Sequence, residues 1–306
     1  MTKVWRKSAL YMDTVVSVEI VTGDLDRQDA GLAINAALEN FSVVEQACSR
    51  FDETSEVMRL IEHVGEPVQV SPVLFEAVRF ALEVAKLTDG EFDPTVGHQL
   101  ETYGFNRHYL TGHEVATHIA SGESVTYRDV TVHEQNRTIQ LDKPLVLDLG
   151  AIAKGLAIDM AGKSLAEFDG FVVNAGGDVL VHGVNEREEP WRVGIRRPDS
   201  ASDVMHTLNI SDGAVCTSGS YERKSPITVD THHILRPAIG KSQNEVVSCT
   251  VVAPFAMLAD ALSTAAFVMG PGRGIELMER CDVDGILVTS SNEIQMTKQM
   301  KRYIDG

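Results

Sequence analysis

The sequence is short of basic residues. Its 306 residues include 27 lysines and arginines against 44 aspartates and glutamates, which gives a net charge of −17. A chain with this balance lacks the basic footprint of a general nucleic-acid binder and is not attracted to an anionic membrane surface. The deficit does not exclude a phosphate ligand, because helix N-termini, glycine-rich turns or a metal ion bind phosphate without net positive charge.

Cysteine is also scarce, and a secretory signal is missing. No C-x-x-C pair or Cys/His zinc pattern occurs among the four widely spaced cysteines, Cys48, Cys216, Cys249 and Cys281. We expect reduced thiols, as in a cytosolic protein. The basic N-terminus is not followed by an apolar segment with a small-residue cleavage site, so we predict a cytoplasmic location.

Hydrophobic periodicity predicts interleaved helices and strands. The expected helices cover residues 27–48, 72–90, 151–167 and 255–269. The expected strands cover 8–22, 130–132, 139–141, 171–173, 179–184, 191–196, 204–210, 246–252 and 283–289, and 101–128 form a polar surface excursion. Many strand pairs are joined by short turns, which favours an α+β fold with mainly antiparallel sheets over a doubly wound parallel fold. No internal repeat or low-complexity linker is present.

The helix expected at 255–269 is almost wholly apolar but carries three side-chain oxygen groups. Asp260, Ser263 and Thr264 are three and four residues apart, so they share one face, and such oxygens suit a hard cation such as Mg²⁺. The alternative is that Asp260 caps a loop or pairs with a core arginine. A central Asp in a membrane span costs roughly 2.5–3.5 kcal/mol, so we predict a buried core helix and no membrane insertion.

Several short motifs at chain turns have both a ligand-binding and a structural interpretation. Asp148, expected at the end of the strand Leu145-Val146-Leu147 and before Gly150, would contact a ligand or cap the helix that follows. Gly176 and Gly177 would allow close approach of a ligand or form a tight turn. The hydroxyls of Thr217-Ser218-Gly219 would contact phosphate or belong to a hairpin turn, and the Phe92–Gly97 motif could be a plain loop.

The order of these motifs resembles the ApbE family of FAD:protein FMN transferases. The resemblance covers roughly residues 8–290 and rests on nine motifs that occur in the family's order. They are Met12-Asp13-Thr14, Ser49-Arg50-Phe51 with Ser55-Glu56, Phe92–Gly97, Asp148–Gly155, Asn174–Asp178, Trp191–Ile195, Thr217–Gly219, His233-Ile234 and Ala259–Thr264.

The resemblance implies an ApbE-like, T-fold-related architecture and an Mg²⁺-dependent enzyme. Such an enzyme would transfer FMN from FAD to a Thr or Ser of an acceptor protein that carries an FMN-binding domain, and would release AMP. A single domain over residues 1–306 is expected, and an arrangement of two lobes with the FAD site between them is left open. Two alternatives also stay open: an FAD pyrophosphatase that gives FMN and AMP, and a non-catalytic flavin-binding protein.

The resemblance also implies roles for individual residues. Asp260 and Thr264 would ligate Mg²⁺, with the Ala151 carbonyl and Ser263 nearby, and His233 and Asp260 would be catalytic. His233 would lie near the pyrophosphate, where it would polarise the phosphoryl group or relay a proton, and an Asp near the metal is the alternative base. The residues expected to contact FAD are Met12, Phe51, Glu91, Phe92, Asp93, Asp148, Lys154, Gly176, Gly177, Thr217, Ser218, His233 and Leu235.

Besides Ala151, which replaces a glycine, the sequence departs from the family pattern at three further positions, none of them a predicted metal ligand. Asp13 replaces a glycine, Arg236 replaces an aspartate after His-Ile, and Phe51 replaces a tyrosine. We expect Asp13 to narrow the cofactor entrance and Arg236 to add positive charge near the AMP half of FAD. The chain carries no clear copy of the family's acceptor motif, so we predict that it does not modify itself.

Overall fold

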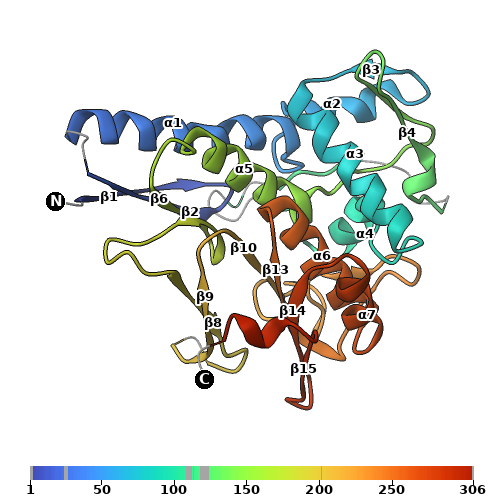
Figure 1. The fold of residues 1–306 in the computed structure, drawn as a ribbon. Coiled ribbons are helices and arrows are strands. Elements are labelled where there is room, and N and C mark those ends of the chain that lie inside the picture. The colour runs from blue at the N-terminus through green and yellow to red at the C-terminus, as the bar shows by residue number, and fades with distance from the viewer. Residues whose placement is uncertain are drawn as a thin grey trace. The chain divides into compact units, whose positions relative to one another are not determined.

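The computed structural model describes residues 3–23, 27–107, 112, 114–117, 124–200 and 202–304 (Figure 1). The chain divides into two compact units. Unit 1 comprises Met1–Ser42, Lys154–Gly219 and Asn244–Gly306, and unit 2 comprises Val43–Ala153 and Ser220–Gln243. Part of the polar stretch predicted at 101–128 lies outside the described residues.

Unit 1 is built on an eight-stranded sheet in the order β1-β2-β6-β7-β10-β13-β14-β15, and every neighbouring pair is antiparallel. This topology confirms the predicted α+β class with mainly antiparallel sheets. The strands are β1 (Lys3–Tyr11), β2 (Thr14–Thr22), β6 (Gly170–Ala175), β7 (Asp178–Gly183), β10 (Gly213–Gly219), β13 (Val246–Ala253), β14 (Asp284–Thr289) and β15 (Ile294–Met296).

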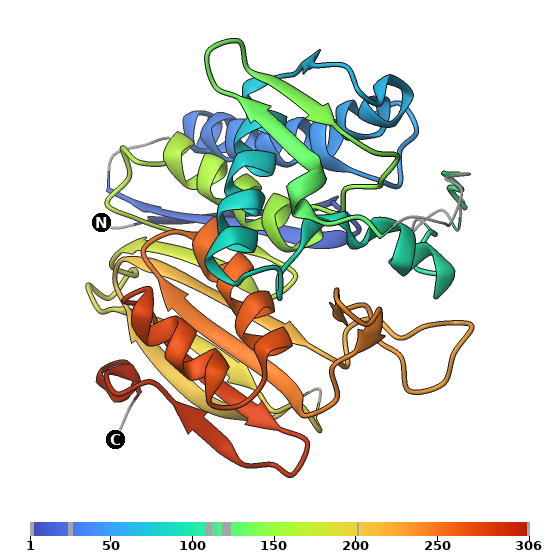
Figure 2. The ribbon, with the colours of Figure 1, turned by 90° about the vertical axis from the view of Figure 1, so that its right-hand side faces the viewer.

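Helices cover one face of this sheet and a two-stranded ribbon covers the other. Helix α6 (Ala256–Met269) packs on β10 and β13, beside α7 (Arg273–Arg280), as Figure 2 shows. Helix α5 (Gly150–Ser164) passes close over Leu180 of β7 at Gly162. On the opposite face, Trp191 and Leu208 of the ribbon β8 (Trp191–Arg196) and β9 (Val204–Ile210) join the buried sheet side chains in one apolar cluster.

Unit 2 combines short helices with two small antiparallel sheets, in the orders β3-β5-β4 and β11-β12. Its helical elements are α2 (Glu56–Arg59), η1 (Leu60–His63), α3 (Pro72–Leu87), η2 (Pro94–Val96), α4 (Gly97–Thr102) and η3 (Tyr127–Asp129). Its strands are β3 (Val68–Gln69), β4 (Val130–His133), β5 (Thr138–Leu141), β11 (Leu235–Arg236) and β12 (Lys241–Ser242). In unit 1, a last helical turn, η4, covers Met300–Arg302.

The predicted helices are confirmed with small shifts at their ends. Helix α1 spans Arg27–Cys48, and α3 begins after Ser71, whose Oγ accepts a hydrogen bond from the Leu74 N–H at 3.2 Å. Helix α5 ends three residues before the predicted 167, at Ser164. Among the helices of the described part of the chain, none combines the length and the hydrophobicity that crossing a bilayer requires.

The strand predicted at 8–22 is wrong, because these residues form a hairpin of two strands, β1 and β2. The chain reverses at Met12 and Asp13, which have φ values of 49° and 60°. Two consecutive positive φ values make the type of two-residue turn that Asn-Gly usually signals, and Met-Asp carries no such signal. The family's glycine at position 13 has the same conformational meaning, and Asp is among the residues that tolerate it. Asp13 therefore serves first as a turn residue.

Two further expectations need correction. Thr217 and Ser218 lie inside strand β10 and not in a hairpin turn. Asp148 does not end a strand, because residues 142–149 are irregular, although Leu145–Leu147 are buried. This segment is held by loop-to-loop bonds, in which Gly97 N donates to the Val146 carbonyl at 3.2 Å and Asp148 N donates to the Pro94 carbonyl at 2.7 Å. An apolar run alone cannot distinguish such a buried connection from a strand.

Two helical glycines of unit 1 should respond to alanine in opposite ways. A Cβ on Gly155 would lie 2.6 Å from the Ala256 carbonyl oxygen, whereas a Cβ on Gly31 of α1 would meet nothing within 4 Å. We expect Gly155→Ala to lower the free energy of unfolding by about 1–3 kcal/mol through overpacking. Gly31→Ala should raise it by about 0.5–1 kcal/mol, because alanine is the better helix former. Urea unfolding of both variants measures this, and equal shifts of one sign would contradict the packing.

Candidate functional site

Asp260 is a buried carboxylate on α6 that is held from α5. Its side chain is 7% exposed, and its Oδ2 accepts a hydrogen bond from the Gly155 N–H at 3.1 Å. The same oxygen lies 3.5 Å from the Lys154 Nζ. The sequence left open that Asp260 pairs with a core arginine. Its charged partner is instead Lys154, a lysine of α5.

Lys154 is shared between two acidic side chains. Its Nζ pairs with the Asp178 Oδ2, while the Asp178 Oδ1 accepts a hydrogen bond from the Thr217 N–H at 2.8 Å. Asp178 is only 5% exposed, and Lys154 is 27% exposed. Buried carboxylates need such compensation, and here two of them share one ammonium group. Asp178 had not been predicted as a site residue, although it closes the Asn174–Asp178 motif.

Hydroxyl groups cluster beside Asp260. The Ser218 Oγ of β10 lies 2.8 Å from both the Ser263 Oγ and the Thr264 Oγ1 of α6. The Ser263 Oγ also donates to the backbone carbonyl of Asp260 at 2.8 Å. The predicted metal ligands Asp260, Ser263 and Thr264 are thus gathered on one face of α6, and Ser218 reaches the same place from the sheet.

A half-buried carboxylate, Asp159 of α5, fixes the start of α6. Its two oxygens accept hydrogen bonds from the N–H groups of Ala256, at 2.7 Å, and Met257, at 2.8 Å. Burial raises the pKa of Asp159 to about 6, although the two N–H bonds oppose the shift, and the charge of Asp260 adds to it. Sequence patterns gave no sign of this helix cap, because Asp159 lies in the middle of another helix.

Asp148 of unit 2 is paired with Arg50. The Arg50 Nε donates to the Asp148 Oδ2 at 2.5 Å, its guanidinium also donates to the Phe105 carbonyl, and it lies 4.3 Å from the centre of the Phe51 ring. Burial would raise the pKa of Asp148, but Arg50 and the Gly150 N–H, bonded at 2.8 Å, hold it below its ordinary range. Arg50 had not been predicted, although it adjoins Phe51 in a family motif.

His233 is neutral at physiological pH. Burial and the nearby Arg223 guanidinium lower its pKa to about 4. Its Nδ1 lies 3.4 Å from the Arg223 carbonyl oxygen, and Phe105 meets its ring edge-on with centroids 6.4 Å apart. A carbonyl oxygen only accepts, so Nδ1 carries the proton and Nε2 has the free lone pair.

Several predicted FAD contacts have structural roles of their own. Asp93 is buried and caps the helical turn η2 that follows it: its Oδ1 accepts from the Thr95 N–H at 2.9 Å and its Oδ2 from the Tyr127 N–H at 2.9 Å. Burial raises its pKa against these bonds. The Phe92–Gly97 motif is therefore not a plain loop. Gly176 and Gly177 form the tight turn between β6 and β7, with φ values of 64° and 105°. The tight-turn interpretation is confirmed for these two glycines, while contact with FAD stays a prediction.

The predicted residues fall on both units. Met12, Lys154, Gly176, Gly177, Thr217, Ser218, Asp260, Ser263 and Thr264 belong to unit 1; Phe51, Glu91, Phe92, Asp93, Asp148, Ala151, His233 and Leu235 belong to unit 2. Within unit 1, the structure brings Lys154 to the Asp260 carboxylate, while the hydroxyl cluster is joined to Asp260 through its backbone carbonyl, to which Ser263 donates. Within unit 2, Asp148 and His233 are coupled electrostatically through their shared neighbour Arg223.

The donor set on α6 fits a hard cation. Carboxylate and hydroxyl oxygens such as those of Asp260 and Thr264 are ligands that Mg²⁺ prefers. In the described ranges no group of three or more His, Cys, Asp or Glu side chains is arranged to hold a metal ion. A cation on α6 would therefore depend on one carboxylate together with hydroxyl and carbonyl oxygens.

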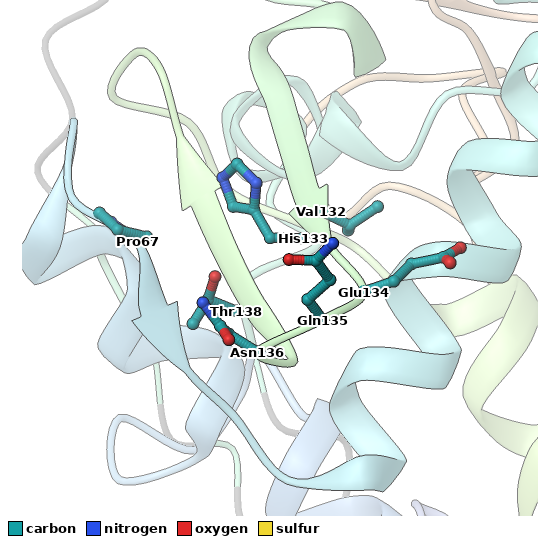
Figure 3. A pocket seen from close by; sticks show the side chains of 7 residues that line it. All are labelled: Pro67, Val132, His133, Glu134, Gln135, Asn136 and Thr138. Carbon is teal, nitrogen blue, oxygen red and sulfur yellow. The ribbon is translucent and has the colours of Figure 1, made fainter.

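A hollow of about 680 Å³ lies elsewhere in unit 2, at the β4–β5 turn (Figure 3). It is lined by Pro67 and by residues of the hairpin from Val132 to Thr138, including His133 and Glu134. None of the residues predicted to contact FAD or a metal lines this hollow. We therefore place the candidate site on the side chains described above.

The sequence profile described as ApbE family matches residues 12–287 of this chain. The chain belongs to the ApbE family. A protein of Vibrio cholerae serotype O1 named FAD:protein FMN transferase is 29% identical over 297 residues, which cover 92% of this chain and 86% of that protein. A Rhodobacter capsulatus protein of the same name is 31% identical over 255 residues, which cover 79% of this chain and 47% of that protein.

Solved structures agree with this ApbE assignment. The crystal structure of the ApbE protein from Thermotoga maritima is similar with a TM-score of 0.86 and 31% identity, over 99% of this chain and 100% of that chain. The flavin transferase ApbE from Vibrio cholerae is similar with a TM-score of 0.82 and 25% identity, over 99% and 100% of the two chains. The predicted ApbE-like architecture is therefore confirmed.

The Arg50–Asp148 pair yields a pH-dependent prediction. Arg50→Met leaves a largely buried carboxylate without its main partner, so we expect the free energy of unfolding at about pH 7 to fall by roughly 2–4 kcal/mol. The lowered pKa of Asp148 means that the pair stabilises the fold above the unfolded pKa of 3.8 and is lost as pH falls through the folded value. The difference in free energy of unfolding between Arg50→Met and the wild type should therefore shrink below about pH 4, and urea unfolding across this range measures it. A deficit that does not change with pH would contradict the pairing.

Proposed function

We propose that this ApbE protein transfers FMN from FAD to a Thr or Ser hydroxyl of an acceptor protein and releases AMP. Relatives named FAD:protein FMN transferase match most of the chain, which supports the activity. The observation that carries the proposal to this chain's own residues is the oxygen cluster on α6, where Asp260 is held by Gly155 and Lys154 beside Ser263 and Thr264.

We propose that Asp260 and Thr264 hold Mg²⁺, with the Ala151 carbonyl and Ser263 as further oxygen donors. When bound, the ion would neutralise charge on the pyrophosphate oxygens. The Lys154 ammonium adds a second positive charge at this place, and Asp178 holds it there. Mg²⁺ and Lys154 would thus place positive charge beside the pyrophosphate of FAD, although the chain as a whole is acidic.

His233 is proposed to accept the proton of the attacking hydroxyl. Its Nε2 has the free lone pair, and its low pKa keeps it in the base form at physiological pH. The acceptor oxygen would form a bond to the FMN phosphorus, the hydroxyl proton would pass to Nε2, and the bond from this phosphorus to the bridging oxygen would break. AMP would leave with the bridging oxygen.

The metal assignment is tested by comparing two carboxylates of unit 1. We expect Asp260→Asn to reduce FMN transfer by at least about 100-fold, because the ligand charge is lost. It should also abolish the rise in melting temperature that Mg²⁺ gives to the free protein. Asp159→Asn keeps an oxygen for the α6 cap and should retain the Mg²⁺-dependent rise.

The measurement uses purified protein with FAD and Mg²⁺, with and without an FMN-acceptor domain. AMP release and a fluorescent acceptor band on a denaturing gel are followed together. Release of AMP with no labelled acceptor would favour the pyrophosphatase over the transferase. Loss of the Mg²⁺ effect in Asp159→Asn and its survival in Asp260→Asn would refute the metal site.

The proposed base predicts an unusual pH profile. Because the pKa of His233 is about 4, its base form is present above that pH and is lost as pH falls through it. We expect the single-turnover rate of FMN transfer to show no inflection near 6.5 and to fall only toward about pH 4. His233→Gln should lower the rate by about 10²–10⁴-fold and remove this acid limb. An inflection near 6.5 that survives in the variant would assign the proton transfer to another group.

A further inference from the structure

A loop of unit 2, residues 224–232, holds aliphatic side chains in solvent. Val229 is 87% exposed and Ile227 is 67% exposed, and all of residues 226–230 are exposed. Single exposed aliphatics are common on protein surfaces, but two at alternating positions of one short loop form a small apolar tip. The question is whether this loop is built to present them.

Local hydrogen bonds fix the backbone of this loop. Lys224 and His232 form a β-bridge at its base, and the Ser225 N–H donates to the Thr231 carbonyl at 2.8 Å. The Ser225 Oγ accepts from the N–H of Ile227 at 3.1 Å, and from the next N–H at 2.9 Å. The loop is therefore a defined turn that exposes Val229 almost fully, whereas Ile227 is largely exposed but has the end of its side chain against Gly104.

A second turn adds another exposed aliphatic next to the same tyrosine. The Ser225 Oγ donates to the Tyr103 carbonyl at 2.7 Å, and the Tyr103 hydroxyl donates to the Gly240 carbonyl at 2.8 Å. Ile239, which precedes Gly240 in the β11–β12 turn, is 58% exposed. Tyr103 thus ties the 224–232 loop to the turn that carries Ile239.

Both ends of the 224–232 loop lie next to His233, the proposed base. The His233 N–H donates to the Arg223 carbonyl at 3.2 Å, directly below the bridge that closes the loop. Val229 and His233 are four positions apart in the chain, so their Cα atoms are at most about 14 Å apart. A protein seated on this loop would have its surface within reach of His233.

The segment also differs in charge from the rest of the chain. Residues 220–243 carry Arg223, Lys224, Arg236 and Lys241 against Glu222 and Asp230, a net charge of +2 in a chain of −17. The loop itself carries one lysine and one aspartate, and the exposed Arg223 and Lys241 flank it and the Ile239 turn. An apolar tip flanked by basic side chains is complementary to a partner that presents apolar side chains flanked by acidic ones.

We propose that the 224–232 loop, together with Ile239, is the surface on which the FMN-acceptor protein docks through an apolar patch with acidic neighbours. This inference rests on the proposed function, because it assumes that a protein hydroxyl is the nucleophile. It assigns the loop to acceptor recognition and not to FAD binding. Loss of the loop's side chains should therefore affect the acceptor and leave the reaction of FAD with water unchanged.

The test uses the full chain with FAD, Mg²⁺ and a purified FMN-acceptor domain. Val229→Ser and the double variant Ile227→Ser/Val229→Ser are compared with Val204→Ser, a control in β9 that is 55% exposed. We expect the KM for the acceptor to rise about tenfold or more in the double variant, as for loss of a central contact. The AMP released without acceptor should stay within twofold of the wild type, and Val204→Ser should match the wild type in both. Lys224→Glu should also raise the acceptor KM.

Each other result has a distinct meaning. Labelling by the wild type with an unchanged acceptor KM in the variants would overturn the docking surface alone. A parallel loss of AMP release would assign the loop to FAD binding, and a change in oligomeric state by sedimentation would assign it to contacts between copies. Absence of any labelled acceptor with the wild type would refute the proposed function, and the docking surface with it.

Discussion

The candidate site depends on reciprocal hydrogen bonds between α5 and α6, in which a carboxylate of each helix accepts backbone N–H groups of the other. Asp159 of α5 accepts two N–H groups at the start of α6, and Asp260 of α6 accepts the Gly155 N–H of α5. These hydrogen bonds need the two helix backbones to approach closely, which is possible because Gly155 has no side chain. The position of Asp260, and of the hydroxyls one turn further along α6, follows from this contact.

These contacts also bring several negative charges together between α5 and α6. Asp178 and Asp260 are buried in unit 1 and Asp159 is half-buried, and Lys154 is the cation that the structure places on two of them. Burial is the main cause of the raised pKa of Asp159, and the charge of Asp260 adds to it. A divalent cation bound at Asp260, as proposed above, would offset part of this negative charge.

The sequence was sufficient for the features that repeat along the chain, and insufficient for those that depend on tertiary contacts. The helices, the antiparallel class and the shared face of Asp260, Ser263 and Thr264 follow from periodicity. The Met12-Asp13 turn was missed because its positive φ values are imposed by the pairing of β1 with β2. The Asp159 cap and the Arg50–Asp148 pair were missed because the partners lie 97 and 98 residues apart, and no local pattern reports such a distance.

Cys216 shows how burial beside α6 keeps a thiol neutral. Its Sγ lies 3.6 Å from the Ala256 carbonyl oxygen, and burial, with Asp260 and Asp159 nearby, raises its pKa well above the ordinary value for a thiol. At neutral pH the sulfur atom therefore keeps its proton and adds no further negative charge next to these carboxylates. Because the thiolate is the reactive form of cysteine, this side chain is also protected from reactions that need a nucleophilic sulfur.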